Sequence, residues 1–404
     1  MVTEASSRVL YAAAGVFDGR TEGLRSGTGV LVADGIVVAV GASAELAEDA
    51  PVRDFGDAVI VPGFVDAHTH VTIRPGEGDQ HGQLENRVAW QTIRGVANLA
   101  QMLRSGVTTA KIMSEMYEID YEFRDAVARG EVAGPRLLVA GPGLSPPGGH
   151  GAGGAGVAGV DDLRAAVRER VEHGADHIKI FTTGGVSSVG PSMSESNYSA
   201  EEIAAIVQEA ASAGLKVSAH ALGGPGVDLA VENGVHTIEH GTLLDAGNIE
   251  RMVEAGTWLV LTTSILFHPA GIERGDAKVP HIMKKVTDAR AYMEGNLDAI
   301  REAGIPFAMG TDSMHGLFGE ELRWLVAHGW SSQDALVAAT RKGGELIGDP
   351  AAGVLEPGSR ADFVVLGGDP FANIDAVLDV NAVYRAGHGV VEGGQVRALP
   401  GKQG

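Results

Sequence analysis

Two histidines, His68 and His70, stand one residue apart in the segment VDAHTH, at the end of the apolar run IVPGFV. Side chains two residues apart in a β-strand point to the same face of the strand. Both imidazoles can therefore reach one metal ion, and imidazole nitrogen is a common zinc ligand. The spacing indicates a metal site where a buried strand ends.

Further residues of ligand type lie in or directly after apolar segments along the chain: Lys179 in HIKIF, His220 in VSAHA, His240 in TIEHG and Asp312 in GTD. Buried imidazoles and carboxylates need partners that offset the loss of water. The set therefore predicts a metal centre. The chain has no cysteine, so histidine, carboxylate and water remain as ligands. Zinc is the default ion for them, although manganese, cobalt, nickel and iron are compatible.

The lysine in the buried segment HIKIF, Lys179, has three interpretations. It could form a salt bridge with Asp312, since a buried ammonium is usually paired or has a shifted pKa. It could form a Schiff base with a carbonyl substrate, which the metal-type neighbours disfavour. As a neutral amine it could instead add carbon dioxide, and the resulting carbamate could bridge two cations. We expect this third state.

Between about residues 62 and 350 one unit recurs, in which a helical stretch ends at a glycine and a short apolar strand follows. Glycine fits the left-handed position that ends a helix. With the strand at IVPGFVDAHTH, the units predict an α/β fold, a (β/α)₈ barrel over residues 62–354 whose active site lies at the carboxyl ends of the strands. The seven glycines are Gly106, Gly130, Gly174, Gly214, Gly234, Gly256 and Gly304.

The two ends of the chain, residues 1–61 and 355–404, have short alternating strands separated by glycine and aspartate. Asp34-Gly35 is a hairpin signal. Isolated hairpins are marginal and chain termini often lie close together. We therefore expect both ends to form one small β-sandwich accessory domain.

Two helix features are specific enough to be checked. Ser199 and Glu202 have the spacing of a capping box, which begins a helix. A second pattern follows the 3.6-residue period and predicts the buried face of another helix. Its members are Ala89, Ile93, Val96, Leu99 and Leu103.

The 404-residue chain carries a formal charge of −21, has a pI near 5.0 and contains no cluster of Lys and Arg. Nucleic acids and anionic membranes are therefore excluded as expected partners. We expect a small-molecule substrate, and a homo-oligomer is compatible with the sequence. No basic and apolar leader and no apolar stretch of about 18 residues is evident, so we expect a cytoplasmic protein. The glycine-rich segments lack the GxGxxG context of nucleotide binding.

Together, VPGFVDAHTH, SGVTT, HIKIF, VSAHA, GVHTIEHG and GTDS resemble the amidohydrolase superfamily, and within it the metal-dependent dipeptidase and imidazolonepropionase-like branch. The resemblance implies that His68, His70 and Asp312 hold a more buried ion. It implies that a more exposed ion is held by His220 and His240, and that carbamylated Lys179 bridges the two. The segment GGHG implies that His150 helps to bind or polarise the substrate carbonyl.

The expected reaction follows from two divalent cations, most simply zinc. A water bridging them ionises near neutral pH, and the hydroxide attacks a polarised carbonyl. Asp312 is the expected general base, which passes the proton to the leaving nitrogen. The expected bond is a C–N bond of a dipeptide, an N-acyl amino acid or an apolar amide, urea or carbamate. Close relatives often carry an aromatic ring after the strand-five histidine, whereas this chain has Leu222, which puts a plain dipeptidase in doubt.

Two other functions remain open. A heterocycle deaminase or cyclic amidohydrolase could use the same ligands, often with one ion. A barrel that holds metal without catalysis could serve as a binding scaffold.

Long segments after the strands, at residues 71–86, 141–159, 184–199 and 264–281, are expected to wall the pocket. Apolar candidates for the wall are Tyr117, Met193, Tyr198, Leu266, Phe267 and Phe318. Polar candidates are Arg74, His81, His268, Arg274 and His315, while Lys111 is expected to have a structural partner.

Overall fold

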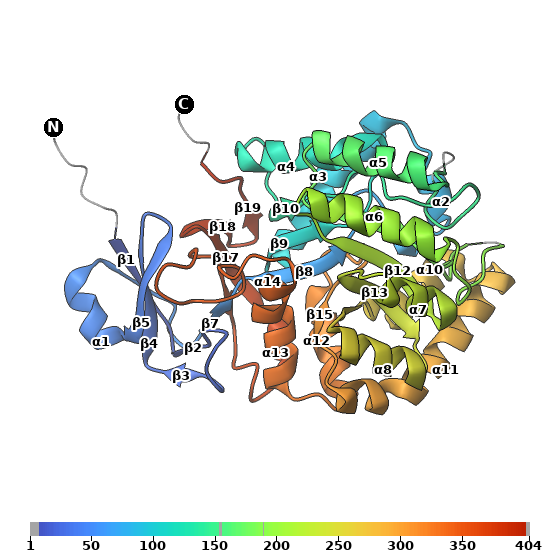
Figure 1. Cartoon of the computed structure of the whole chain (residues 1–404). Helices are drawn as coiled ribbons and strands as arrows, with labels where there is room; N and C mark the ends of the chain where they lie inside the picture. Colours follow the sequence, from blue (N-terminus) through green and yellow to red (C-terminus); the bar gives the residue numbers. More distant parts are fainter. Residues whose placement is uncertain (1–7, 153–155, 189, 401–404) are drawn as a thin grey trace.

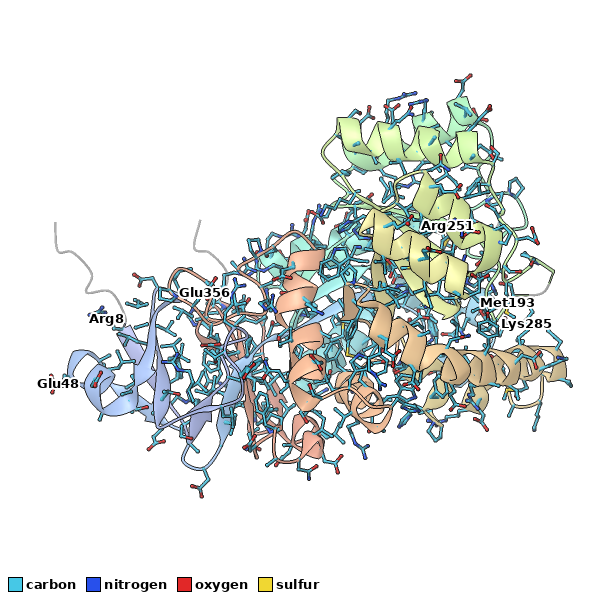
Figure 2. All side chains as sticks on the ribbon, turned by 60° about the horizontal axis from the view of Figure 1, so that its bottom comes forward. Arg8, Glu48, Met193, Arg251, Lys285 and Glu356 are labelled. Carbon is cyan, nitrogen blue, oxygen red and sulfur yellow. The ribbon has the colours of Figure 1, made fainter. Side chains whose placement is uncertain are left out.

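The computed structural model describes residues 8–152, 156–188 and 190–400. Figure 1 shows a β-rich part that holds both chain ends, beside a larger part in which helices surround a set of strands. Figure 2 places Arg8 and Glu48 at the β-rich end and Met193 and Lys285 at the opposite end. Residues 153–155 and 189 of the expected pocket segments lie outside the described residues, as do 1–7 and 401–404 of the expected sandwich. None of the helices described in Figure 1 is both long and apolar enough to cross a membrane.

The eight strands of the larger part lie in two parallel sheets, of order β10-β9-β8 and β11-β12-β13-β14-β15. Every predicted barrel strand is present. Their bounds are β8 (Phe64–Thr69), β9 (Val107–Ile112), β10 (Arg136–Leu138), β11 (Ile178–Phe181), β12 (Val217–Gly223), β13 (Thr237–Leu243), β14 (Trp258–Leu261) and β15 (Phe307–Met309).

Backbone hydrogen bonds join the two sheets at both edges. On one side Leu144 donates to the carbonyl of Lys179 at 2.8 Å and accepts from the amide of Phe181 at 2.9 Å. On the other side the amide of Asp312 donates to the carbonyl of His68 at 2.9 Å. The strands therefore follow one another around a closed ring, and the predicted (β/α)₈ barrel is confirmed.

Helices cover the outside of the ring (Figure 1). All seven glycines that the sequence places at helix ends have positive φ, between 67° and 86°, which confirms the reason for their presence. The helices are α2 (Gln80–Leu84), α3 (Val88–Arg104), α4 (Ile119–Ala128), α5 (Val160–Glu172), α6 (Ala200–Ser212), α7 (Gly224–Glu232), α8 (Ala246–Ala255), α9 (Ser264–Phe267), α10 (Ile272–Asp276), α11 (Pro280–Ala303), α12 (Phe318–Ala327), α13 (Ser332–Ala339) and α14 (Arg341–Leu346). Short 3₁₀ helices are η2 (Pro75–Glu77) and η3 (Met116–Glu118).

The two helix predictions have opposite outcomes. Helix α6 begins with the capping box, in which Ser199 and Glu202 satisfy each other's backbone amides. The predicted buried face of α3 is wrong in its first half, because Ile93 is 74% exposed. Two amides, Gln91 and Asn98, are buried there instead.

Hydrogen bonds explain why the buried face of α3 is polar. Asn98 donates to the carbonyl of Val71 at 2.7 Å and accepts from Nε of Arg74 at 2.9 Å. Gln91 donates to the carbonyls of Leu84 and Asn86. The helix thus binds the backbone of the segment after β8, and a buried carbonyl needs such a donor more than it needs an apolar neighbour.

The β-rich part consists of two sheets, of order β5-β4-β1-β6 and β19-β18-β17-β16-β7-β2-β3. The second sheet pairs β7 from the N-terminal side with β16 from the C-terminal side, so the predicted sandwich from both chain ends is confirmed. The limits 1–61 and 355–404 stay a prediction. The elements are β1 (Arg8–Ala12), β2 (Gly15–Val16), β3 (Arg25–Ser26), β4 (Thr28–Ala33), β5 (Ile36–Ala42), α1 (Ser43–Leu46), η1 (Ala47–Asp49), β6 (Val52–Asp54), β7 (Val59–Pro62), β16 (Phe363–Leu366), η4 (Ile374–Leu378), β17 (Val380–Arg385), β18 (His388–Glu392) and β19 (Gln395–Val396).

Aromatic residues form the centre of the sandwich. Phe363 and Tyr384 stack with ring centroids 4.5 Å apart, and Tyr11 packs edge-on against both. The Asp34-Gly35 turn joins β4 to β5 with positive φ at both residues, as the hairpin signal predicts.

One residue, Gly63, separates β7 of the sandwich from β8 of the barrel. A Cβ at this position would lie 2.1 Å from Oγ1 of Thr108, so no larger residue fits. The strand that carries His68 is therefore anchored directly in the sandwich.

We predict that Asn98→Ala lowers the free energy of unfolding by about 1–3 kcal/mol, because the carbonyl of Val71 loses its buried donor. On the same helix, Ile93→Ala should change it by less than about 0.5 kcal/mol, since Ile93 is exposed. Denaturant unfolding followed by circular dichroism compares the two. A larger loss for Ile93→Ala would contradict the polar face described here.

Candidate metal centre

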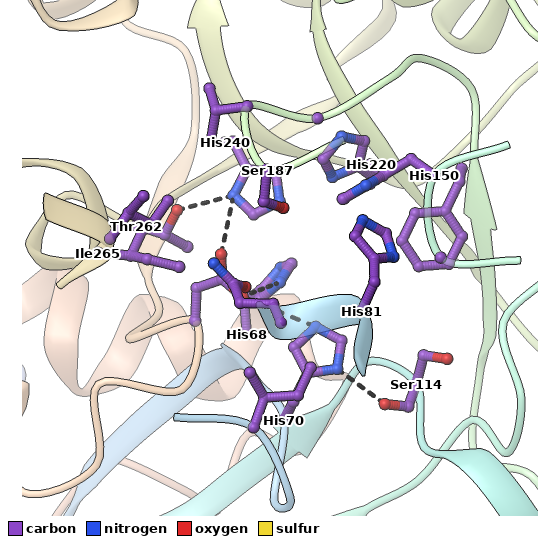
Figure 3. Close-up of a pocket in the computed structure, with 18 of the residues that line it drawn as sticks. His68, His70, His81, Ser114, His150, Ser187, His220, His240, Thr262 and Ile265 are labelled. Atoms are coloured by element: carbon purple, nitrogen blue, oxygen red, sulfur yellow. Dashed lines mark hydrogen bonds and ion pairs between the residues drawn. The ribbon is translucent and has the colours of Figure 1, made fainter. Parts of the chain in front are cut away.

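The six predicted ligand residues line one cavity at the mouth of the barrel, and Figure 3 shows the four histidines among them around it. Nε2 of His68 lies 3.5 Å from Oδ1 of Asp312, and Nε2 of His70 lies 3.7 Å from the same oxygen. Nδ1 of His240 lies 3.9 Å from Oδ2 of Asp312. One potential ligand atom each from His68, His240 and Asp312 lie within 4.8 Å of one another, which is close enough to bind one ion.

The imidazole rings form a continuous series across the mouth. Ring centroids are 4.6 Å apart for His68 and His240, and 4.7 Å apart for His240 and His220. His150 follows, 4.4 Å from His220. The rings therefore lie side by side along the cavity, and the division of the ligands between two ions stays a prediction.

Lys179 is 2% exposed, and among the described residues its Nζ has no hydrogen-bond partner. No ion pair joins it to Asp312 within 4 Å in the described chain, so the salt-bridge interpretation is wrong for this structure. Burial lowers the pKa of Lys179 to about 8, against the opposing effect of the Glu239 and Asp312 carboxylates. A neutral amine is thus accessible near neutral pH, as carbamate formation requires.

Burial keeps the imidazoles of four candidate residues neutral, whereas the carboxylates of Asp312 and Glu239 outweigh burial and raise the pKa of His68. It lowers the pKa of His70 to about 4 and that of His150 to about 3. It lowers the pKa values of His220 and His240 well below their usual range. Neutral imidazole is the form that binds a metal ion.

Three residues that the sequence analysis missed orient these imidazoles. Nδ1 of His68 donates to Oε2 of Glu239 at 2.6 Å, and Nδ1 of His70 donates to the carbonyl of Ser114 at 2.7 Å. Nδ1 of His240 hydrogen-bonds with Oγ1 of Thr262 at 2.7 Å. In proteins that bind metal, such contacts fix which nitrogen faces the ion. The only sequence signal was the acidic Glu239 within the apolar strand TIEH.

These contacts involve Nδ1 of His68 and leave its other ring nitrogen, Nε2, without a hydrogen bond. It is buried and has no hydrogen-bond partner within the described residues. A buried polar atom usually has a partner. The lone pairs of His68 and Lys179, together with the carboxylate of Asp312, therefore fit a divalent cation.

The backbone turns sharply at two of the candidate ligands. His240 has φ of 75° and Asp312 has φ of 45°, in the left-handed region that residues other than glycine rarely adopt. Asp66 restrains the second turn, because it accepts hydrogen bonds from the amide and hydroxyl of Thr311. Strain of this kind is typical of functional sites.

The cavity above the candidate ligands encloses about 890 Å³, part of it open to solvent. Of the predicted wall residues, Leu266 and His81 line it. Lys111 does have the predicted structural partner, since it donates to Oγ of Ser218 at 2.7 Å. The lining residues that the sequence analysis missed include Ile73, Leu84, Met116, Phe181, Val186 and Ile265.

The other candidates for the wall do not line this cavity, and several of them have partners elsewhere. Phe318 stacks on Phe64, Phe267 packs on Trp324, and Tyr198 donates to the carbonyl of Val157. Tyr117 is 53% exposed, and Figure 2 shows Met193 at the rim of the molecule. Nε2 of His315 donates to the carbonyl of His70 behind the site. The remaining three, Arg74, His268 and Arg274, likewise do not line this cavity.

The model of the amidohydrolase family matches residues 59–395. The ochratoxinase of Aspergillus niger is 28% identical over 436 aligned residues, which cover 98% of this chain and 88% of that protein. The imidazolonepropionase of Nocardia farcinica is 25% identical, with 90% and 89% covered. A crystal structure of a Xaa-Pro dipeptidase with bound methionine has a TM-score of 0.87 and 26% identity, and the match covers 95% of this chain and 99% of that one.

We predict that Glu239→Gln weakens binding of a divalent ion by about 10- to 100-fold, because His68 loses the carboxylate that orients it. Competition with a chromogenic chelator measures this affinity. Asp120→Asn is the matched control, since this buried carboxylate accepts from backbone amides, among them those of Ala140 and Gly141, and no hydrogen bond joins it to a candidate ligand among the described residues. Equal affinities for the two variants would contradict the role of Glu239.

Proposed function

Because the chain belongs to the amidohydrolase family, as the match over residues 59–395 establishes, and is a hydrolase acting on C–N bonds, we propose that it uses two divalent metal ions to cleave an amide-type bond. The observation that carries this proposal is that four imidazoles and a carboxylate line the same cavity as a buried lysine whose Nζ finds no hydrogen-bond partner in the described part of the chain. Zinc is the expected ion for these ligands.

The proposed ligands are those that the resemblance implies. His68, His70 and Asp312 would hold one ion, His220 and His240 would hold the other, and Lys179, as a carbamate, would be a ligand to both. Bound divalent cations supply Lewis acidity, which polarises a carbonyl and makes water more acidic. The near-neutral pKa of Lys179 supports the carbamate, because only the free amine adds carbon dioxide.

Asp312 acts as the general base in this proposal. Burial alone would raise the pKa of Asp312, but the nearby ring of His68, whose Nε2 lies 3.5 Å from Oδ1, holds that pKa well below its usual range, so Asp312 is ionised at neutral pH. It accepts a proton from the attacking water and delivers it to the leaving nitrogen. His150 faces the same cavity and contacts the substrate carbonyl. Its Nδ1 hydrogen-bonds with Oγ of Ser188 at 2.6 Å, which leaves Nε2 for the substrate.

We predict that the purified protein binds about two equivalents of divalent metal per chain and loses activity on chelation. Carbon-13 NMR with labelled bicarbonate should show a carbamate signal that Lys179→Ala removes. Lys111→Met is the matched control, since Lys111 is also buried with a pKa near 8 but has Ser218 as its partner. This variant should keep the signal.

Two other results would redirect the assignment. One equivalent of metal with unmodified Lys179 would favour deamination or ring opening of a heterocycle. Metal-replete protein that hydrolyses none of a broad panel of amides, ureas and carbamates would favour a binding scaffold.

We predict that Asp312→Asn lowers kcat/KM by about 10²- to 10⁴-fold, because the attacking water loses its proton acceptor. Metal content measured on the same sample separates loss of the base from loss of an ion. The control is Asp176→Asn at the amino end of β11, where residues of such barrels affect stability rather than catalysis. Wild-type turnover by Asp312→Asn with full metal content would refute the assignment.

A further inference from the structure

One side of the cavity is an apolar wall formed by Ile265 and Leu266 of α9 and Ile272 of α10. All three residues are at least 95% buried and pack on α11 through Ile282 and Val286. Val186, from the segment after β11, packs against this cluster and also lines the cavity. The wall is therefore a supported surface with space beside it for an apolar group.

The cavity offers a substrate carboxylate no cationic partner apart from the proposed metal centre. Among its described lining residues there is no arginine, and the single lysine is Lys179. Two cations of α11 face the segments around the cavity, but both bind backbone carbonyls. Arg290 donates to the carbonyl of Leu266 at 2.7 Å, and Lys285 donates to that of Ser188 at 2.8 Å.

Two polar side chains of α2, Gln80 and His81, line the cavity. The Nε2 atom of each is buried and lacks a hydrogen-bond partner among the described residues. Burial lowers the pKa of His81, so its ring is neutral at pH 7 and can carry one proton on Nε2. Figure 3 shows His81 next to His150, and their ring centroids lie 5.4 Å apart. These two donors point to an acceptor that belongs to the ligand.

Resting on the function proposed above, we propose that the substrate is an uncharged amide, urea or carbamate with an apolar group that packs on Ile265, Leu266 and Ile272. Gln80 and His81 hydrogen-bond to an acceptor of this substrate outside the bond that is cleaved. A free carboxylate next to that bond is disfavoured, because it would lose water without gaining a cation.

The test compares N-benzoyl-L-phenylalanine with N-benzoyl-L-phenylalaninamide, which have nearly the same shape and differ in charge. Benzoate release by the metal-replete protein gives kcat/KM for each. We expect at least a tenfold preference for the neutral amide, since an unpaired buried charge costs far more than tenfold in binding. Equal values, or a preference for the acid, would overturn the inference while leaving hydrolysis of C–N bonds intact.

Binding separates failure of the inference from failure of the proposed function. If neither compound is hydrolysed, calorimetric titration of both into the metal-replete protein still compares their dissociation constants. Tighter binding of the amide would support the inference although the proposed hydrolysis failed. Tighter or equal binding of the acid would refute it.

Variants of the wall and of α2 test the two parts separately. Val186→Arg adds a cation to the wall and should narrow the preference for the neutral compound, whereas Val186→Met, similar in length and uncharged, should keep it. His81→Phe removes a proposed hydrogen-bond donor. For an anilide that carries a distal acetyl group, this variant should raise KM about threefold to tenfold and change kcat little. For the same anilide without the acetyl group, KM should not rise. A uniform effect on both anilides would show a structural role only.

Discussion

The buried carboxylate of Glu239 is the charge on which the mouth of the barrel depends. It accepts a hydrogen bond from His68, and its charge opposes the loss of protons that burial imposes on Lys111 and Lys179. Burial alone would raise the pKa of Glu239, but the hydrogen bond and these charges lower it to about 2. Glu239 on β13 contacts His68 of β8, and its charge acts on Lys111 of β9 and Lys179 of β11, so a closed barrel is needed to bring these strands around it.

The backbone of the barrel places the candidate ligands around Glu239. His68 extends from a strand that Gly63 joins directly to the sandwich, and its carbonyl accepts from the amide of Asp312. That bond closes the barrel and holds the candidate base beside the first two histidines. The unfavourable φ of Asp312 persists because Asp66 accepts hydrogen bonds from Thr311 and the carbonyl of His68 accepts one from the amide of Asp312, while His240 is held within β13. The rigid barrel is therefore what allows strained backbone angles to persist at its mouth.

Periodic and local signals made much of this predictable. Period-two spacing placed His68 and His70 on one face, glycines marked the helix ends, and the Ser199–Glu202 pair marked the start of α6. The pocket wall was not predictable in this way, because segments without periodicity form it. The apolar pattern of α3 failed for a related reason: Gln91 and Asn98 are buried to bind carbonyls of such a segment. Glu239 was missed because a single acidic residue in a strand does not indicate which side chain it will contact.

Both the net charge of the chain and the charges that line the cavity favour an uncharged ligand. The chain carries −21 charges, which repel an anion before it reaches the barrel. Inside, the described lining contains Asp312 as its one carboxylate and Lys179 as its one lysine, and both belong to the candidate metal centre. Burial lowers the pKa values of the other lining histidines except His68, which belongs to the candidate metal centre, so the ring of His81 beyond that centre is neutral at pH 7. Long-range repulsion and the cost of desolvation thus act with the same sign against a carboxylate, and neither acts against an uncharged apolar molecule.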